Sequence, residues 1–160
     1  MLVGGMGNLF WAIENSIASL LRCDRKTVLE HTKILIVEDE AVIAMHLSMI
    51  IEDCGGEVIG PAISVAEALA LIAAGAEIEG AVLDGNLGDG DVTPVALELV
   101  AKAIPVVIYS GVGIPPDLAS IHPDLPVVLK PQAASKAISL LVASIEDKQI
   151  CKQICRLHLP

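Results

Sequence analysis

Short apolar runs, unbroken by polar residues, recur along this chain at nearly even intervals. Such a run is typical of a strand covered on both faces, as in a parallel sheet. Each interval is long enough for one strand and one crossover helix. The spacing therefore predicts an α/β domain built from five β-loop-α repeats. The runs are ILIV at 34–37, VI at 58–59, AVL at 81–83, VVI at 106–108 and VVL at 127–129.

Helix start and stop signals lie between these runs. Residues 40–54 are apolar nearly all round and end at a Gly-Gly pair, which predicts a well-buried first helix. Ser64 and Glu67 have capping-box spacing, and Thr93-Pro94 offers an N-cap followed by a first-turn proline. Residues 132–147 are predicted to form the last helix. The fourth crossover, 111–126, contains four prolines, so we expect only a short helical turn there.

The acidity of the chain is confined to its middle. Residues 33–131 hold fifteen acidic and three basic side chains, and this segment accounts for the formal charge of −10. So few bases and only three aromatic rings argue against nucleic acid as a partner, and anionic lipid would repel such a surface. Mean hydropathy is high, at +0.68, yet charged residues, glycines and prolines interrupt every long apolar stretch. We expect no membrane association.

The cysteines and the start of the chain bear on its compartment. The four cysteines lack the spacing of a disulfide framework, and the first residues lack the pattern of a secretory signal. A reducing, cytoplasmic location is the expectation.

The two ends are expected to lie outside the repeats. We predict an N-terminal extension at 1–32, a domain at 33–147 and a tail or helix extension at 148–160. The extension has an amphipathic pattern that predicts a helix, which either packs on its own domain, remains poorly ordered or contacts a partner. In the tail, Cys151, Cys155 and His158 share one helical face and are three potential zinc ligands, but the same stretch also suits a simple helix extension or a frayed tail.

Polar side chains follow four of the apolar runs directly. In an open parallel sheet the carboxyl ends of the strands lie at one edge, where ligands bind. Carboxylates about 5 Å apart repel by about 3 kcal/mol at an effective dielectric constant of 20, so such a cluster requires a cation or protonation. The residues that follow the runs are Glu38, Asp39 and Glu40, then Asp84, Gly85 and Asn86, then Tyr109 and Ser110, and finally Lys130 and Pro131.

These residue types suit phosphoryl transfer. Asp84 is placed to be a carboxylate nucleophile that accepts a phosphoryl group as an acyl phosphate. Ser110 can donate to one phosphoryl oxygen and Lys130 can neutralise another, while Gly111 leaves room for the group. An all-oxygen ligand set favours Mg²⁺ over zinc. The predicted magnesium ligands are Asp39, Asp84 and the backbone carbonyl of Asn86, with Glu38 nearby.

Four segments together resemble the receiver domain of two-component response regulators over about residues 33–147. They are ILIVEDE, VLDGNLGDG, VVIYSG and VVLKP, in the family's order and spacing. The resemblance implies a flavodoxin-like, doubly wound five-stranded parallel sheet of order 2-1-3-4-5, here preceded by the extra N-terminal helix. It also implies phosphorylation of Asp84 by a sensor histidine kinase or phosphotransfer protein, with Mg²⁺ as cofactor. Ser110 and Lys130 would carry the phosphorylation-dependent change, and Lys130-Pro131 resembles the family's lysine and cis proline.

Departures from the family pattern concern the output. Val127 stands where receivers usually carry a switch aromatic, and Gln132 replaces an aromatic that often follows the Lys-Pro pair. Tyr109 is either a core residue or a substitute switch aromatic. The PVVIYSG segment is similar to a subset of single-domain receivers, many from alphaproteobacteria, with a poorly formed fourth helix.

Three functions are weighed. The first is a stand-alone receiver that is not an enzyme and acts through a protein partner or as a phosphate relay. A homodimer through the N-terminal helix or the fourth and fifth helices is a further expectation. The second is an inactive pseudo-receiver used for docking. The third, a haloacid-dehalogenase-type phosphatase, fits poorly, because Asn86 stands where that family needs a second Asp and Asp84 follows the third strand rather than the first.

Overall fold

The computed structural model of the chain describes residues 28–157, and its centre is a five-stranded parallel sheet of order β2-β1-β3-β6-β7. Numbered along this sheet, the order is the 2-1-3-4-5 arrangement implied by the resemblance, so the flavodoxin-like fold is confirmed. All five predicted strands are present, each covering its predicted apolar run. They are β1 (Lys33–Val37), β2 (Glu57–Ala62), β3 (Gly80–Leu83), β6 (Val106–Ser110) and β7 (Val127–Leu129).

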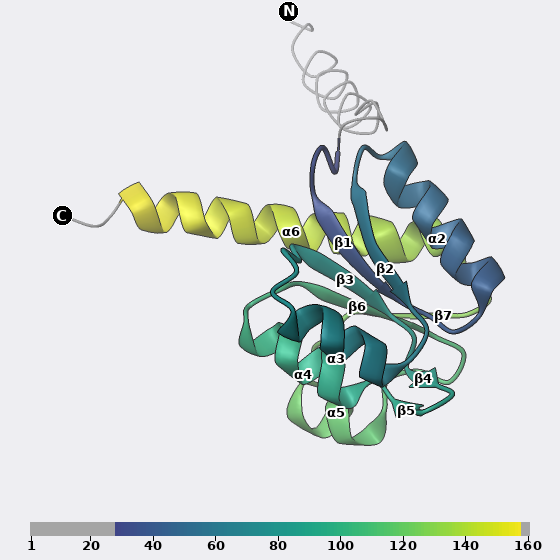
Figure 1. Cartoon of the computed structure of the whole chain (residues 1–160). Coiled ribbons are helices and arrows are strands. Elements are labelled where there is room, and N and C mark those ends of the chain that lie inside the picture. Colours follow the sequence, from purple (N-terminus) through teal and green to yellow (C-terminus); the bar gives the residue numbers. More distant parts are fainter. Residues whose placement is uncertain (1–27, 158–160) are drawn as a thin grey trace, which may run out of the picture.

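Helices cover both faces of the sheet (Figure 1). One face carries α2 (Ala41–Asp53) and α6 (Ala134–Leu157), which contact each other. The other face carries α3 (Val65–Ala73), α4 (Thr93–Ala101) and α5 (Pro116–Ile121). The two layers give the sheet two separate apolar cores, which explains why its strands are unbroken apolar runs rather than alternating ones.

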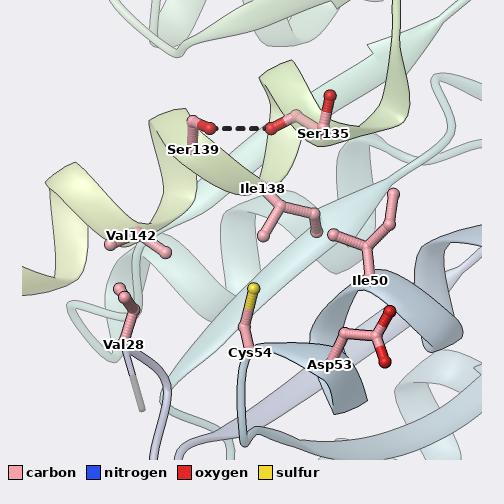
Figure 2. Close-up of a pocket in the computed structure, with 8 residues that line it drawn as sticks. All are labelled: Val28, Ile50, Asp53, Cys54, Ser135, Ile138, Ser139 and Val142. Carbon is pink, nitrogen blue, oxygen red and sulfur yellow. Dashed lines mark hydrogen bonds between the residues drawn. The ribbon is translucent and has the colours of Figure 1, made fainter. Parts of the chain in front are cut away.

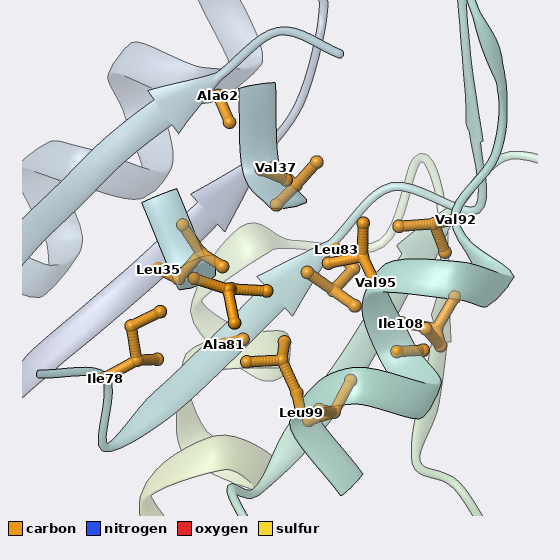
Figure 3. Close-up of a cluster of buried hydrophobic side chains, with 14 of the residues drawn as sticks. Leu35, Val37, Ala62, Ile78, Ala81, Leu83, Val92, Val95, Leu99 and Ile108 are labelled. Atoms are coloured by element: carbon orange, nitrogen blue, oxygen red, sulfur yellow. The ribbon is translucent and has the colours of Figure 1, made fainter. Parts of the chain in front are cut away.

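The two cores divide the strand residues by alternation. Leu35 and Val37 of β1 face the α3–α5 side, whereas Ile34 and Ile36 face the α2–α6 side, and all four are fully buried. Figure 3 shows the first of these cores, where Leu83 and Ile108 of neighbouring strands lie in the same cluster as side chains of α4. This packing fixes the strand register and hence the positions of the residues that follow each strand.

The helix predictions hold in outline and need two corrections. Ser64 caps α3 by accepting from the Glu67 amide at 3.1 Å, as its spacing predicts. Thr93 was expected to be the N-cap of α4 but lies inside the helix, because the Asp91 carboxylate accepts from its amide at 2.8 Å. The last helix begins at Ala134 rather than 132 and continues to Leu157, so the helix extension, one of the alternatives for the tail, is what the structure shows up to that residue.

The structure also contains a hairpin that was not predicted. Two-residue strands β4 (Asn86–Leu87) and β5 (Gly90–Asp91) pair antiparallel directly after β3. The six-residue α5 agrees with the short helical turn expected in the proline-rich fourth crossover. The predicted N-terminal helix and His158 lie outside the described residues. No helix within residues 28–157 combines the length and apolar character needed to cross a bilayer.

Candidate functional site

Three carboxylates converge at the carboxyl edge of the sheet. Glu38 and Asp39 follow β1, and Asp84 follows the neighbouring strand β3. One oxygen from each lies within 4.8 Å of the others. Backbone hydrogen bonds hold the strand ends in place: the Asp84 amide donates to Val37 O at 2.8 Å, and the Glu38 amide donates to Ala62 O at 2.9 Å. The cluster predicted from the strand ends is therefore present.

Lys130 enters the cluster from the end of β7. Its Nζ donates to Glu38 Oε2 and to Asp84 Oδ2, each at 2.8 Å, and lies 4.0 Å from Glu40 Oε1. Glu38 is 1% exposed and Asp84 is 8% exposed, so both carboxylates meet the ammonium where water screens charge weakly. Glu40 belongs to the same acidic run as Glu38, but no role was predicted for it.

Burial and charge shift two pKa values in this cluster. Burial raises the pKa of Glu38, and the nearby Asp84 charge adds to the rise, while the Lys130 ammonium opposes it. Burial lowers the pKa of Lys130, but its hydrogen bonds and attraction to Asp84 and Glu38 outweigh this, so that pKa lies above its ordinary value. Lys130 is thus held as a cation facing a surplus of negative charge.

Ser110 and Gly85 complete the edge of the site. Ser110 ends β6, is 1% exposed, and its Oγ accepts from the Val112 amide at 3.3 Å. A Cβ at Gly85 would lie 2.8 Å from Ser110 Oγ, so the serine hydroxyl packs against the residue that follows Asp84. A Cβ at Gly111 would meet no atom within 4 Å, which agrees with open space beside Ser110.

The donor set fits a hard divalent cation. Carboxylate oxygens are the ligands that Mg²⁺ prefers, and a single ammonium leaves the negative charge of the cluster incompletely neutralised. Asp39 is exposed, so one side of the cluster is open to solvent, as a metal that keeps several waters requires. Asn86 starts β4 beside the cluster, and its backbone amide donates to Asp84 Oδ1 at 3.4 Å. Its carbonyl as a ligand stays a prediction.

Comparison with solved structures places this arrangement among known proteins. SdrG from Sphingomonas melonis Fr1 is 37% identical, with a TM-score of 0.59 over 74% of this chain and 98% of SdrG. A response regulator receiver protein from Sinorhizobium medicae is 24% identical, with a TM-score of 0.63 over 73% of this chain and 96% of that one. The chain belongs to the response regulator receiver family.

A longer relative shares the receiver fold. The response regulator PhyR from Brucella abortus is 25% identical, with a TM-score of 0.73, and the match covers 92% of this chain but only 61% of PhyR. No family model and no curated protein matches the sequence. The family assignment therefore stands on solved structures together with the four motifs, and the subset with a poorly formed fourth helix stays a prediction.

This receiver also has a groove away from the carboxylates. It lies between α2 and α6 and has a volume of 510 Å³ (Figure 2). Apolar side chains line it, with Asp53 and two serines of α6 at its margin. None of the predicted site residues lines this groove, so it does not belong to the phosphoryl-transfer chemistry. The lining residues are Val28, Ile50, Asp53, Cys54, Ser135, Ile138, Ser139 and Val142.

Tyr109 is the residue here whose role the sequence left open. It precedes Ser110 on β6 and is 7% exposed. Its hydroxyl donates to Gln132 O at 2.8 Å. A tyrosine directly before the site serine was the available signal, but sequence alone does not show which backbone group its hydroxyl reaches.

The lysine-proline pair agrees with the resemblance, and Val127 is a departure from it. The Lys130-Pro131 peptide bond is cis. Val127 occupies β7 and packs, half-buried, against the α3–α5 core. The structure thus has an aliphatic side chain at the position where other receivers usually carry the switch aromatic.

Proposed function

We propose that this receiver is a phosphoacceptor in a phosphorelay, that Asp84 is the acceptor, and that the phosphoryl group comes from a histidine kinase or phosphotransfer protein. The observation that carries the proposal is the placement of Asp84, Glu38 and Lys130, with both carboxylates hydrogen-bonded to one ammonium at the edge of the sheet. A carboxylate held in this way is available as a nucleophile, and the lysine is in place for the charge of an incoming phosphoryl group.

The transfer would balance as a single displacement at phosphorus. An Asp84 oxygen attacks, an O–P bond forms, and the P–N bond to the donor imidazole breaks. The imidazole keeps that electron pair and leaves as the neutral ring, with its other nitrogen protonated. Lys130 exchanges a carboxylate partner for a phosphoryl oxygen, and Ser110 donates to a second oxygen. Asp39, Asp84 and the Asn86 carbonyl, with Glu38 nearby, would hold Mg²⁺, which would supply further neutralisation of the phosphoryl charge.

An exposed apolar surface beside the site suits the approach of the donor protein. Val42, Met45 and Met49 of α2 are each more than half exposed, as is Ile63 after β2. A groove of 490 Å³ runs between these two elements and reaches Glu38. A protein that bears the phosphohistidine must come this close to reach Asp84, so we assign this surface to the donor.

The decisive experiment uses acetyl phosphate with Mg²⁺, which needs no donor protein. Wild-type protein is expected to be labelled on Asp84, and Asp84→Asn is expected to abolish labelling. Undiminished labelling of Asp84→Asn overturns the acceptor assignment. Asp124→Asn, an exposed change far along the chain, is the control and is expected to be labelled normally.

The proposal includes the absence of enzymatic turnover and of a nucleic-acid or membrane partner, and it places the protein in the cytoplasm. p-Nitrophenyl phosphate separates a receiver from a haloacid-dehalogenase-type phosphatase, since a receiver shows essentially no turnover of it. A beryllofluoride-treated sample compared with an untreated one in a pull-down tests for an output partner that recognises the phosphorylated state. Identical partners in both samples contradict a phosphorylation-gated interaction.

The pseudo-receiver remains the second candidate, and Mg²⁺ titration by NMR tests it. An inactive docking module predicts unchanged resonances near Asp39 and Asp84. The proposed receiver predicts shifts at both, because both are assigned as magnesium ligands.

A further inference from the structure

The chain has one tyrosine, Tyr109, and it lies next to the site on the strand β6. Its ring is buried in the α2–α6 core together with Val128, Ala134 and Ile138. It therefore faces the opposite side of the sheet from Val127 and the α3–α5 core. Tyr109 therefore does not occupy the space that an aromatic side chain at position 127 would occupy.

Tyr109 and its neighbour Ser110 hold the two ends of one short turn. The Tyr109 hydroxyl donates to Gln132 O at 2.8 Å, and Ser110 O accepts from the Lys130 amide at 2.9 Å. The Lys130 Nζ also lies 5.5 Å from the centroid of the Tyr109 ring. Adjacent residues of β6 thus fix the backbone of residues 130–132 at both ends and place an aromatic face beside the lysine head group.

These contacts bear directly on where the ammonium points. A lysine side chain has four rotatable bonds, so its head group keeps one position only when its backbone and its surroundings are both fixed. Buried hydroxyl groups are costly to leave unpaired, which favours keeping the Tyr109 bond to Gln132 O. An aromatic face within about 6 Å attracts an ammonium. All three effects favour the orientation in which Lys130 reaches Glu38 and Asp84.

We propose that Tyr109 is a positioning residue for Lys130: its hydroxyl fixes the turn of residues 130–132 and its ring steadies the ammonium aimed at Asp84. The consequence for phosphoryl transfer rests on the proposed function. The turn leads directly into α6, where Lys136 Nζ donates to the Gln132 side chain at 2.6 Å. A change in the hydrogen bonds of the Lys130 ammonium is therefore transmitted through Tyr109 and Gln132 to the first turn of α6. This helix lies on the face of the sheet opposite Val127.

Two variants separate the hydroxyl from the ring. Tyr109→Phe removes the hydrogen bond to Gln132 O, and Tyr109→Leu removes the bond and the aromatic face together. Ile108→Val is the matched control, because Ile108 is the preceding residue of β6, is fully buried, and faces the other core. It removes one methylene from the same strand, on the face of the sheet opposite the Tyr109 ring.

The first readout is the rate of labelling by acetyl phosphate with saturating Mg²⁺. Misplacement of a charge-stabilising group by a fraction of an ångström lowers the rate of the chemical step, so we expect the maximal labelling rate constant to fall about tenfold in Tyr109→Leu and by less in Tyr109→Phe. We expect the half-saturating concentration of acetyl phosphate to change by less than about twofold, and Ile108→Val to match the wild type. Equal maximal rate constants in all four proteins overturn the proposal, even where thermal stability falls.

The second readout needs no phosphorylation and so distinguishes this proposal from the proposed function. The Lys130 side-chain resonances, assigned by their loss in Lys130→Met, report its environment in the resting protein. We read them in Tyr109→Phe, which keeps the ring and therefore its ring-current effect, and expect them to move toward those of exposed lysines there and to stay in place in Ile108→Val. Unmoved resonances in Tyr109→Phe overturn the positioning role of the hydroxyl. If wild-type protein is never labelled, the proposed function fails, while this readout still decides the role of Tyr109.

Discussion

Lys130 Nζ donates a 2.8 Å hydrogen bond to Asp84 Oδ2, across 46 positions of sequence and the one strand, β6, that separates β3 from β7. The same ammonium binds Glu38, so one cation serves two buried carboxylates. Removing one partner of such a buried cluster leaves the other charges uncompensated, and this costs more than the pair contributes. The relationship links stability, metal binding and phosphoryl transfer.

Lys130→Met should destabilise the protein by about 3 kcal/mol in buffer without divalent cations, because Glu38 and Asp84 then repel each other with no ammonium between them. Mg²⁺ should restore part of this loss by taking over the neutralisation. Thermal or denaturant unfolding in EDTA and in millimolar Mg²⁺ measures both effects.

A surface pair provides the control for that experiment. Lys102 and Glu98 form an exposed i, i+4 ion pair in α4, with 3.0 Å between Nζ and Oε1. Lys102→Met should change stability by less than about 0.5 kcal/mol, and Mg²⁺ should not alter the difference. Equal destabilisation by the two lysine substitutions would show that the buried cluster has no special cost.

Asp39 should matter for magnesium binding but not for the stability of the metal-free protein. Asp39 is exposed and contributes an oxygen to the three-carboxylate cluster. Asp39→Asn removes one ligand charge, so we expect the apparent Kd for Mg²⁺ to rise about tenfold. The midpoint of unfolding without Mg²⁺ should stay unchanged or rise, because one like-charge repulsion is gone.

A Mg²⁺ titration of the unfolding midpoint measures this affinity, since a ligand that binds only the folded state stabilises it in proportion to its occupancy. Asp124→Asn, exposed and outside the cluster, should leave the titration curve unchanged. A wild-type curve for Asp39→Asn would remove Asp39 from the ligand set.

The sheet and the edge cluster were predictable because both depend on features local in sequence. Unbroken apolar runs show which segments become central strands. Parallel strands bring their carboxyl ends to one edge of the sheet, so the residues that follow them, Glu38, Asp84 and Lys130, lie at that edge. The strand order itself came from the family resemblance. No local pattern in the runs distinguishes the neighbour of β1 from the neighbour of β7.

The features that were not predicted depend on single side-chain contacts or on elements too short to show a sequence pattern. The amide of Thr93 is capped by Asp91, two residues earlier, because an Asp side chain competes effectively for a nearby backbone amide. The β4–β5 hairpin has two residues in each strand, too few to show a periodic pattern. The stretch 148–157 left a helix extension and a frayed tail both open, because its Lys, Gln and Arg residues favour helix formation but no local pattern shows where the end of a helix frays.

Gly85 should tolerate no side chain, although its backbone needs no special conformation. A Cβ there would lie 2.8 Å from Ser110 Oγ and 2.9 Å from Gly113 O, both closer than ordinary contacts. Gly85→Ala should therefore displace Ser110 or the loop after β6, at a cost of about 2 kcal/mol. Labelling by acetyl phosphate should fall with it, because the serine hydroxyl and Asp84 share this corner of the site.

Gly111→Ala is the matched control for that substitution. A Cβ at Gly111 meets no atom within 4 Å, so stability should change by less than about 0.5 kcal/mol. The variant still narrows the space beside Ser110 that a phosphoryl group would need. Normal stability with reduced labelling in Gly111→Ala would locate the phosphoryl group there, and normal labelling would place it elsewhere.

The hairpin caps a helix that is distant in sequence. Asp89, in the turn between β4 and β5, accepts from the Val65 and Ala66 amides at 2.9 and 3.1 Å, at the start of α3. These bonds satisfy helix amides that have no partner within the helix, and a carboxylate is favoured at this end of a helix. Asp89→Ala should lower Tm by about 3 °C, which thermal unfolding at neutral pH measures.

The effect of Asp89 should depend on pH in a defined direction. The amides of Val65 and Ala66 hold the pKa of Asp89 below its ordinary value in the folded protein. A depressed pKa in the folded state means that the carboxylate stabilises fully above the unfolded-state pKa of about 4, and that this stabilisation is lost as the pH falls toward the folded pKa. The Tm difference between wild type and Asp89→Ala should therefore be constant from pH 6 to 8, within about 1 °C, and shrink below about pH 4. A difference that is unchanged at low pH would mean that the charged carboxylate is not the cap.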